Sequence, residues 1–204
     1  MKQKAGILIL IISVMWMLHT FSKNFMVDPQ FEKFISKKDQ ILTDYNLWIS
    51  MIRIHILLAI ISLITGPLGV IKAIRDKSRN FHRWNGRIYV LSIILNFIPG
   101  VYVSFFATGG LPSIIGFLIL NTLWLTTTIL GFWYIIRQKV MLHSQWIIRS
   151  FFLSFANINI YIIVAISHNL MNFSYVNSYT IAVWLCWPLN LIAAEFVIRR
   201  KLFF

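Results

Sequence analysis

The chain has 204 residues, of which 58% are hydrophobic, 16% are aromatic and only 12% are charged. Soluble domains carry roughly 25% charged residues, so this composition excludes most soluble classes. The net charge of +13 does not indicate a nucleic-acid partner, because too little polar sequence remains to build a water-exposed basic face. The single cysteine excludes a disulfide scaffold. We therefore interpret the chain as an integral membrane protein.

Six stretches are long and apolar enough to cross a bilayer, which takes about 20 residues of helix. They are residues 5–21, 47–73, 88–106, 114–136, 146–167 and 180–198. The first stretch ends without a small-residue cleavage site, so we interpret it as an uncleaved helix and not as a secretory signal. The predicted fold is an all-α bundle of six transmembrane helices. It forms a single membrane domain over residues 1–204, with an outer loop at residues 22–46.

The positive charges predict how this bundle is oriented. If the N-terminus is cytoplasmic, 14 of the 19 lysines and arginines fall on the cytoplasmic side and 5 fall outside. Such an excess fixes the orientation of membrane proteins, so we expect both termini in the cytoplasm. Besides the lipid bilayer itself, the basic inner face predicts anionic lipid headgroups on the cytoplasmic side as partners.

Polar and small residues recur at helical spacing within the predicted spans. The faces they form are Asn85, Tyr89, Ser92, Asn96 and Gly100 in the third span; Ser150, Ser154, Asn157 and Tyr161 in the fifth; and Ala59, Ser62, Gly66 and Gly69 in the second. Polar side chains are costly in hydrocarbon, so these faces should point into the bundle. Two interpretations stay open. The residues join helices to one another, or they line a cavity for a cofactor, a quinone or a substrate.

Four of the five histidines fall near the ends of predicted spans, in two pairs. His55 and His168 are expected at the outer face, whereas His82 and His143 precede the third and fifth spans at the inner face. Histidine is the usual axial ligand of haem, so each pair is a candidate set of ligands for haem b. Hydrogen-bonded structural histidines are the alternative. We interpret His19 as an interfacial residue.

The spacing within the fifth span bears on this hypothesis. The 25 residues from His143 to His168 return to nearly the same side of a continuous helix, which would stack two sites along one internal surface. The same interval rises about 37 Å, and that distance counts against direct electron transfer between two haems.

Arginines and aromatic residues gather at the predicted inner surface. The candidate cofactor-binding residues there are Arg83, Arg87, Tyr89, Trp146 and Arg149. The planar guanidinium suits carboxylate or phosphate, so these residues could hold haem propionates or an anionic headgroup. The alternative is that they only anchor the protein to lipid phosphates.

Three segments resemble a known family. They are HRWNGRIYV at 82–90, GPLG at 66–69 and HSQWIIRSFFLSFA at 143–156. They are similar to an uncharacterised family of bacterial predicted membrane proteins, of the domain of unknown function 2306 type, over roughly residues 50–200. The resemblance implies a multi-pass protein of the bacterial cell membrane. A weaker likeness to six-helix b-type cytochromes implies two haems between paired histidines, although the fourth span here carries no histidine.

Several enzyme classes find no support in the sequence. No HExxH zinc motif and no nucleophile triad is present, so hydrolysis is not indicated, and only a redox role stays open. Carboxylates are nearly missing from the spans, which disfavours proton-driven transport. The exception, Glu195, lies one turn before Arg199 and predicts an ion pair with it. Cys186 is interpreted as a packing residue.

Three function hypotheses follow from these residues. The first is a haem-binding or membrane redox protein. The second is a small transporter or lipid-handling protein that uses the polar faces. The third is a non-catalytic assembly subunit whose inner loop, with Arg75, Lys77 and Arg79, docks a partner.

Overall fold

The computed structural model describes residues 2–39 and 42–202, and its regular structure is helical. In chain order the elements are α1 (Lys2–Phe21), a π-helical turn (Ser22–Val27), α2 (Glu32–Ile35), α3 (Tyr45–Val70), α4 (Lys72–Lys77), α5 (Arg79–Ser104), α6 (Gly110–Ile136), α7 (Val140–Leu153), α8 (Ala156–Val164), a second π-helical turn (Ala165–Leu170) and α9 (Tyr175–Arg199). Within the described residues there is no β-strand. The predicted all-α class is therefore confirmed.

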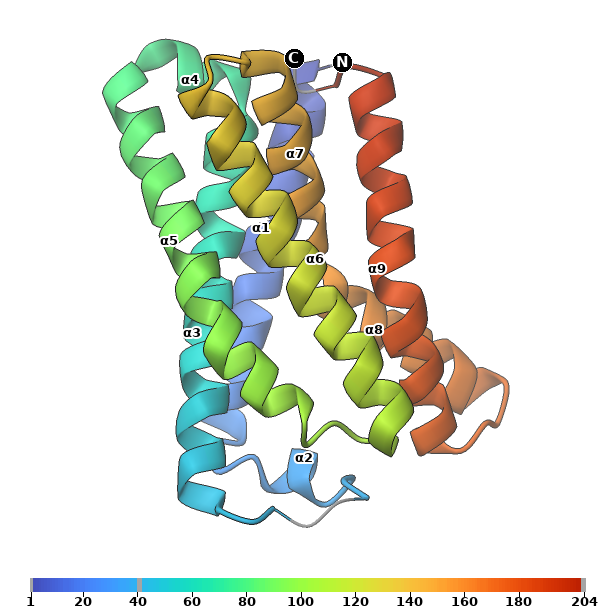
Figure 1. The fold of residues 1–204 in the computed structure, drawn as a ribbon. Helices are drawn as coiled ribbons and strands as arrows, with labels where there is room; N and C mark the ends of the chain where they lie inside the picture. The colour runs from blue at the N-terminus through green and yellow to red at the C-terminus, as the bar shows by residue number, and fades with distance from the viewer. Residues whose placement is uncertain (1, 40–41, 203–204) are drawn as a thin grey trace.

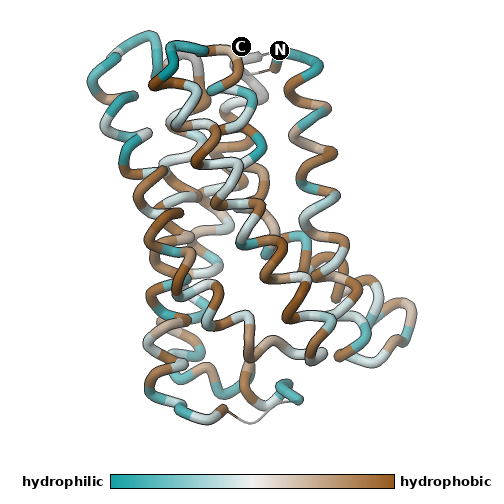
Figure 2. The backbone as a smooth tube through the Cα atoms, in the orientation of Figure 1, coloured by the Kyte–Doolittle hydropathy of each residue, from teal (hydrophilic) through white to brown (hydrophobic). Residues whose placement is uncertain are grey.

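Six segments are long and apolar enough to cross a membrane, as predicted. They are Gly6–Val27, Tyr45–Val70, Arg79–Ser104, Gly110–Ile136, Val140–Leu170 and Tyr175–Arg199. Both termini lie at one end of the bundle, together with α4 and the α6–α7 turn, whereas α2 lies at the opposite end (Figure 1). We call these the terminal end and the loop end. Hydrophilic residues gather toward the two ends, and apolar residues dominate the length between them (Figure 2).

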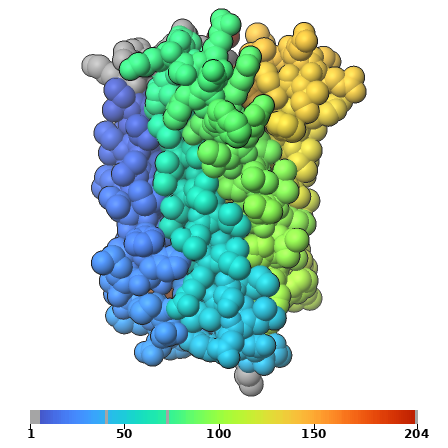
Figure 3. Space-filling view, turned by 90° about the vertical axis from the view of Figure 1, so that its left-hand side faces the viewer, coloured from blue at the N-terminus to red at the C-terminus, as the bar shows by residue number. Residues whose placement is uncertain are grey.

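Helix α1 is the most peripheral of the membrane helices. Only 11% of its most apolar window is buried, against 33–39% in the other five spans. It packs on α3, and α3 in turn packs on α5, so that the three lie side by side on one face of the molecule (Figure 3). Further contacts join α5 to α6, α6 to α7, α3 to α7, and α9 to α6, α7 and α8. The central helices therefore position the buried polar residues.

The third span begins earlier than the hydropathy predicted. Helix α5 starts at Arg79 and not at residue 88, so His82 lies inside the helix instead of preceding it. Ser78 caps this N-terminus, because its hydroxyl accepts a hydrogen bond from the Phe81 backbone N–H at 3.2 Å. Hydropathy marks only the apolar core of a helix, so a polar first turn at the headgroup level escapes it. His143 likewise lies inside α7, which begins at Val140.

The fifth span is broken, which corrects the expectation of one continuous helix. Helix α7 ends at Leu153 and α8 begins at Ala156. The N–H groups of Ser154 and Phe155 bond the carbonyls three residues back, at 3.1 and 3.0 Å, so the chain turns tightly there. A further π-helical turn follows α8. The prediction that His143 and His168 share one side of a helix assumed a rotation of about 100° per residue along a continuous helix. These two irregularities interrupt the helix, so the predicted single internal surface does not form.

The segments that resemble the family pack together through small residues. Gly66 of α3 faces the Phe151 ring of α7, and a Cβ added at Gly66 would lie 2.2 Å from Phe151 Cδ2. Phe151 is fully buried and stacks edge-on against Phe155 with ring centroids 5.1 Å apart. The ring therefore has no space into which it could withdraw, and a glycine at position 66 permits this contact.

We predict that Gly66→Ala lowers the thermal unfolding temperature of the purified protein, because overpacking a dense core typically costs about 1–3 kcal/mol. Gly86→Ala in α5 is the matched control, since a Cβ there meets no atom within 4 Å. Alanine also favours helix over glycine by about 1 kcal/mol, so the control should be neutral or stabilising. Equal unfolding temperatures for the two variants would contradict this packing.

Candidate functional site

Hydrogen bonds join the family-like segments at the half of the bundle nearer the terminal end. The Asn85 amide of α5 donates to the Thr65 backbone carbonyl of α3 at 2.7 Å. The Tyr89 and Ser150 hydroxyls, from α5 and α7, lie 2.7 Å apart. The same Ser150 hydroxyl lies 2.6 Å from that of Thr128 in α6, which itself donates to the Trp124 carbonyl at 2.7 Å. Interhelical hydrogen bonds of this kind average about 0.6 kcal/mol in membranes.

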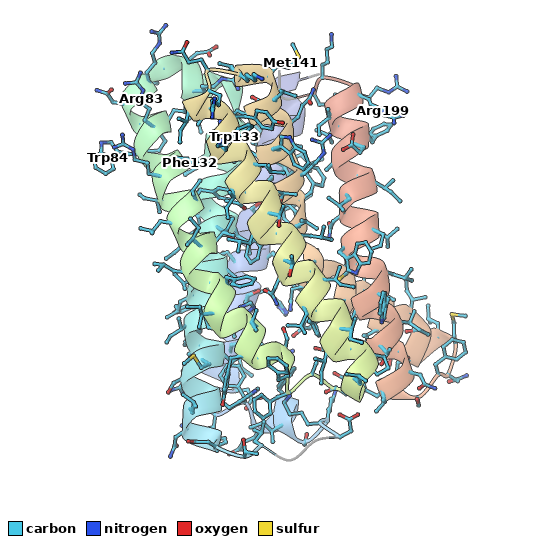
Figure 4. The ribbon with its side chains drawn as sticks, viewed as in Figure 1. Arg83, Trp84, Phe132, Trp133, Met141 and Arg199 are labelled. Atoms are coloured by element: carbon cyan, nitrogen blue, oxygen red, sulfur yellow. The ribbon has the colours of Figure 1, made fainter. Side chains whose placement is uncertain are left out.

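This network places Tyr89 differently from the other candidate cofactor residues. Tyr89 is 2% exposed and belongs to the central apolar core, whereas Arg83 and Arg87 are exposed. Figure 4 shows Arg83 and Trp84 directed away from the bundle near the terminal end. The Arg87 guanidinium lies 5.0 Å from the centre of the Trp84 ring. The structure therefore does not bring Tyr89 together with Arg83 and Arg87.

Arg149 forms the strongest polar contact between α7 and α9. Its Nε donates to Glu195 Oε1 at 2.6 Å, and its guanidinium lies 4.6 Å from the centre of the Trp146 ring. The expected pairing of Glu195 with Arg199 is thus replaced by a contact between helices. Spacing along one helix identifies only partners on that helix. Arg149 instead reaches the Glu195 carboxylate from the facing helix α7.

The two histidines that were expected at the inner face belong to α5 and α7. His82 and His143 are close enough to interact electrostatically, and Arg75 interacts with both. His143 Nδ1 lies 2.8 Å from the Gly131 carbonyl oxygen of α6. Because a carbonyl oxygen can only accept, Nδ1 carries the proton in this bond, and the bond also fixes the orientation of the ring.

The two outer histidines are not brought together. His168 lies in the exposed turn after α8, where its Nδ1 is 2.8 Å from the Phe173 carbonyl oxygen and its ring packs on Tyr175. His55 lies on α3 and lines an internal cavity. Helix α3 and the turn at residues 165–170 occupy opposite sides of the bundle in Figure 1. His19 is exposed and stacks on Trp16, with ring centroids 4.9 Å apart, as expected of an interfacial residue.

The cavity occupies the half of the bundle nearer the loop end. Its volume is about 140 Å³. Residues of α3, α5, α6, α8 and α9 form its walls, and so does the break between α7 and α8. The polar lining residues are Lys38, His55, Ser104, Asn121, Ser154, Asn157 and Tyr179. Several of them belong to the predicted polar faces, so part of those faces does line a cavity.

Several polar atoms at this cavity lack hydrogen-bond partners among the described residues. They are His55 Nδ1, Trp124 Nε1 and Ser154 Oγ. Neighbouring polar groups do lie close, since Asn96 faces His55, and the Tyr89 hydroxyl is near Ser154 and Trp124. None of these approaches meets hydrogen-bonding geometry. Buried polar groups are nearly always satisfied. Other atoms without partners, such as Ser13 Oγ and both amide atoms of Asn96, lie on residues that do not line the cavity, so it is the cavity beside these three that gives room for another molecule.

Gly100 keeps two of the polar side chains close together. A Cβ added there would lie 2.6 Å from Asn121 Oδ1 and 3.2 Å from His55 Nδ1. The Asn121 amide nitrogen is occupied, because it donates to Ser104 Oγ at 3.1 Å and to the Phe117 carbonyl at 3.0 Å. The amide orientation that results turns the Asn121 oxygen toward His55 and the backbone of Gly100.

The outer loop covers the cavity at the loop end. The Lys38 ammonium donates to the Phe106 carbonyl and lies 5.1 Å from the ring centres of both Phe34 and Trp48. The next residue, Asp39, accepts the Gly109 backbone N–H at 2.9 Å. These contacts attach the loop to the α5–α6 turn. Burial lowers the pKa of Lys38 to about 8, an effect that the neighbouring Asp39 carboxylate partly offsets.

Sequence reasoning did not single out Lys38, Trp124 or Tyr179. Lys38 lies in a loop of mixed charge, where a solvated lysine is the usual interpretation. Trp124 and Tyr179 lie in apolar spans, where aromatic residues normally belong to the core. The signal that could have found Lys38 is its position beside the aromatic residues Phe31 and Phe34, which predicts a loop folded onto the bundle.

A sequence model of the family described as "Predicted membrane protein (DUF2306)" matches residues 52–198. The chain belongs to this family. No curated protein and no solved structure matched it. The DUF2306 range contains the three signature segments and the cavity walls from α3 to α9. Phe34 and Lys38, which cover the cavity, lie outside that range, so the cover is a feature of this chain beyond the matched domain.

For this DUF2306 member we predict that Glu195→Gln lowers the thermal unfolding temperature by a few degrees. The variant keeps the shape of the side chain but removes a partly exposed ion pair, which is worth about 1 kcal/mol. Exchanging the two residues, as Arg149→Glu with Glu195→Arg, should recover part of the loss. Glu32→Gln in the outer loop is the control and should change nothing. An unchanged unfolding temperature for Glu195→Gln would show that the contact contributes no stability.

Proposed function

We propose that this protein binds a small polar solute within the membrane, as a small transporter or solute-binding protein. The observation that carries the proposal is the cavity of about 140 Å³, whose wall holds polar atoms without partners in the described part of the chain. Leaving such atoms unsatisfied costs about 1–3 kcal/mol each, so a ligand or ordered water is expected there.

The cavity volume limits the size of the solute. An apolar cavity of about 150 Å³ accommodates benzene, and a water molecule takes about 30 Å³. The cavity therefore suits a solute of roughly four to eight non-hydrogen atoms, or a few waters in its place. A whole quinone with its tail and a whole lipid acyl chain both exceed a volume of about 140 Å³.

The helix break supports a solute site of this kind. Leu153 and Ser154 on one side of the break, and Ala156 and Asn157 on the other, all line the cavity. Irregular backbone within a membrane is tolerated where it is buried in protein or lines a polar cavity. Interrupted helices are also a common way in which transporters present backbone and side-chain groups to a solute at mid-membrane.

The residues at the outer end do not fit haem. His55 Nδ1 is enclosed by Gly100 and Asn121, its proposed partner His168 lies in an exposed turn, and the cavity beside His55 is smaller than a porphyrin. Among the described residues no group of three or more His, Cys, Asp or Glu side chains could hold a metal ion. We therefore derive no part of the proposed function from haem.

Cation–aromatic pairs support a definite orientation. Among the described residues, arginine pairs of this kind lie at the terminal end, namely Arg87–Trp84, Arg137–Trp133, Arg149–Trp146 and Arg200–Phe196. The corresponding lysine pairs lie at the loop end. Trp84, Trp133 and Phe196 are exposed. Exposed aromatic rings with arginines suit the headgroup level, so we propose that the terminal end is cytoplasmic and contacts anionic lipid headgroups.

We predict that small solutes raise the unfolding temperature of the wild-type protein in lipid nanodiscs. The probes are propionamide, propionate and propylammonium. Each is tested up to 50-fold above the concentration that gives half of its full effect on the unfolding temperature. Ser154→Leu should abolish the effect, because the leucine fills the cavity while removing a hydroxyl that has no hydrogen-bond partner. Thr122→Leu, on an exposed position of α6, is the control and should respond like wild type. If none of the probes stabilises the wild type, or if Ser154→Leu still responds, the proposal is wrong.

For orientation, we predict that green fluorescent protein fused at the C-terminus fluoresces in bacterial cells, and that alkaline phosphatase fused at the same point is inactive. The same reporters fused after residue 108, in the turn at the loop end, should give the opposite result. Phosphatase activity of the C-terminal fusion would reverse the proposed orientation.

A further inference from the structure

We propose that the cavity selects a short monoanionic solute, a carboxylate of about four to eight non-hydrogen atoms with a small apolar tail. The head would lie at Lys38 near the loop end, and the tail would lie along the apolar walls. This inference rests on the proposed solute-binding function and names the chemical class of its ligand. Charge, hydrogen-bonding capacity and wall composition each support it.

The charge at the cavity is positive. Lys38 is the only lysine or arginine among the described lining residues, and no Asp or Glu is found among them. Asp39, the nearest acid in sequence, directs its Oδ2 to the Gly109 backbone N–H and does not line the cavity. A lone cation at the mouth of a low-dielectric cavity attracts anions and repels cations, because Coulomb energies rise as the dielectric constant falls.

The unsatisfied polar groups are mainly donors. Trp124 Nε1 can only donate, and among the described residues it has no partner, although Trp124 is 8% exposed. The Ser154 hydroxyl is also without a partner there and can donate. On the acceptor side the Asn121 oxygen faces Gly100. These donors complement a solute or ordered water that offers acceptor atoms, whereas an ammonium group can only donate.

The rest of the wall is apolar. Phe117, Leu120, Leu153 and Ile160 line the cavity on the side of α6 to α8. An ion hydrated on every side would gain nothing from these residues, whereas a short hydrocarbon tail would be desolvated against them. A solute with one charged end and one apolar end therefore uses both parts of the cavity.

Lys38 is held in place before any solute binds. Its ammonium contacts the Phe106 carbonyl and the Phe34 and Trp48 rings, so little side-chain freedom remains to be lost on binding. The titratable group that interacts with it is Asp39 on its own segment, and His55 from α3 and Tyr179 from α9 are the other titratable residues that line the same cavity. Since the pKa of Lys38 is about 8, the ammonium is largely charged at pH 7, and a bound anion would raise its pKa further.

The test compares solutes of equal size and different charge at constant ionic strength and pH 7. Calorimetry on the protein in nanodiscs should show propionate binding at least tenfold more tightly than propionamide, with propylammonium weakest. Lys38→Met should remove the preference for propionate and keep the binding of propionamide. Lys37→Met is the matched control, because Lys37 is exposed and lies over the Tyr175 ring instead of the cavity.

A second variant keeps the test decisive if Lys38→Met does not fold. Lys38→Arg preserves the charge at all accessible pH values. Wild-type affinity for propionate should fall as the pH rises above about 8, the pKa of Lys38 in the free protein, by up to tenfold per pH unit, and should level off above the higher pKa of Lys38 in the complex. The affinity of Lys38→Arg should stay level through the same range.

Two outcomes would overturn this inference and leave the solute-binding proposal intact. They are equal or tighter binding of propionamide by the wild type, and unchanged propionate affinity in Lys38→Met. Failure of every probe to bind the wild type would instead refute the solute-binding function itself, and the anion preference with it.

Discussion

The structure depends on one constraint, which is that polar groups inside a membrane must find partners within the protein. Most serine and threonine hydroxyls meet it locally by bonding a carbonyl three or four residues back, as Thr65 and Ser104 do. The Tyr89, Ser150 and Thr128 hydroxyls meet it across three helices. Among the described residues, the buried polar atoms that lack a partner are spread over the bundle, and three of them, His55 Nδ1, Trp124 Nε1 and Ser154 Oγ, belong to residues that also line a cavity.

The two halves of the bundle therefore have different roles. The half nearer the termini contains the segments by which the family is recognised, and their side chains are occupied with one another, as Asn85 with Thr65 and Gly66 with Phe151 show. The half nearer the outer loop contains the cavity. A recognisable sequence signature here marks mainly the packing between helices, whereas the proposed binding groups, apart from Ser154, lie outside the three signature segments.

The sequence predicted the helices well, because apolar length is a direct physical requirement of the bilayer. It also predicted that Ser92 and Asn96 point inward, and both are buried, whereas Asn157 and Tyr161 of the predicted face in the fifth span are exposed. It could not predict the break at Ser154 and Phe155, since neither proline nor glycine marks it, and the pairing of His55 with His168 depended on an unbroken helix. Lys38 was missed for another reason. Its environment is created largely by residues distant in the sequence, since Trp48 is 10 positions away and Phe106 is 68 positions away.

The break in the fifth span changes what one crossing of the membrane contacts. Helix α7 packs on both α6 and α9, whereas α8 packs on α9, so α9 contacts both parts of the broken span. The Arg149–Glu195 ion pair belongs to the α7–α9 contact, and residues on both sides of the break line the cavity. A movement of α8 together with α9 would therefore disturb the α7–α9 contact, whereas the hydroxyl network of Tyr89 lies entirely on α5, α6 and α7. Helix α9 thus bridges the interruption and holds the two parts of the cavity wall together.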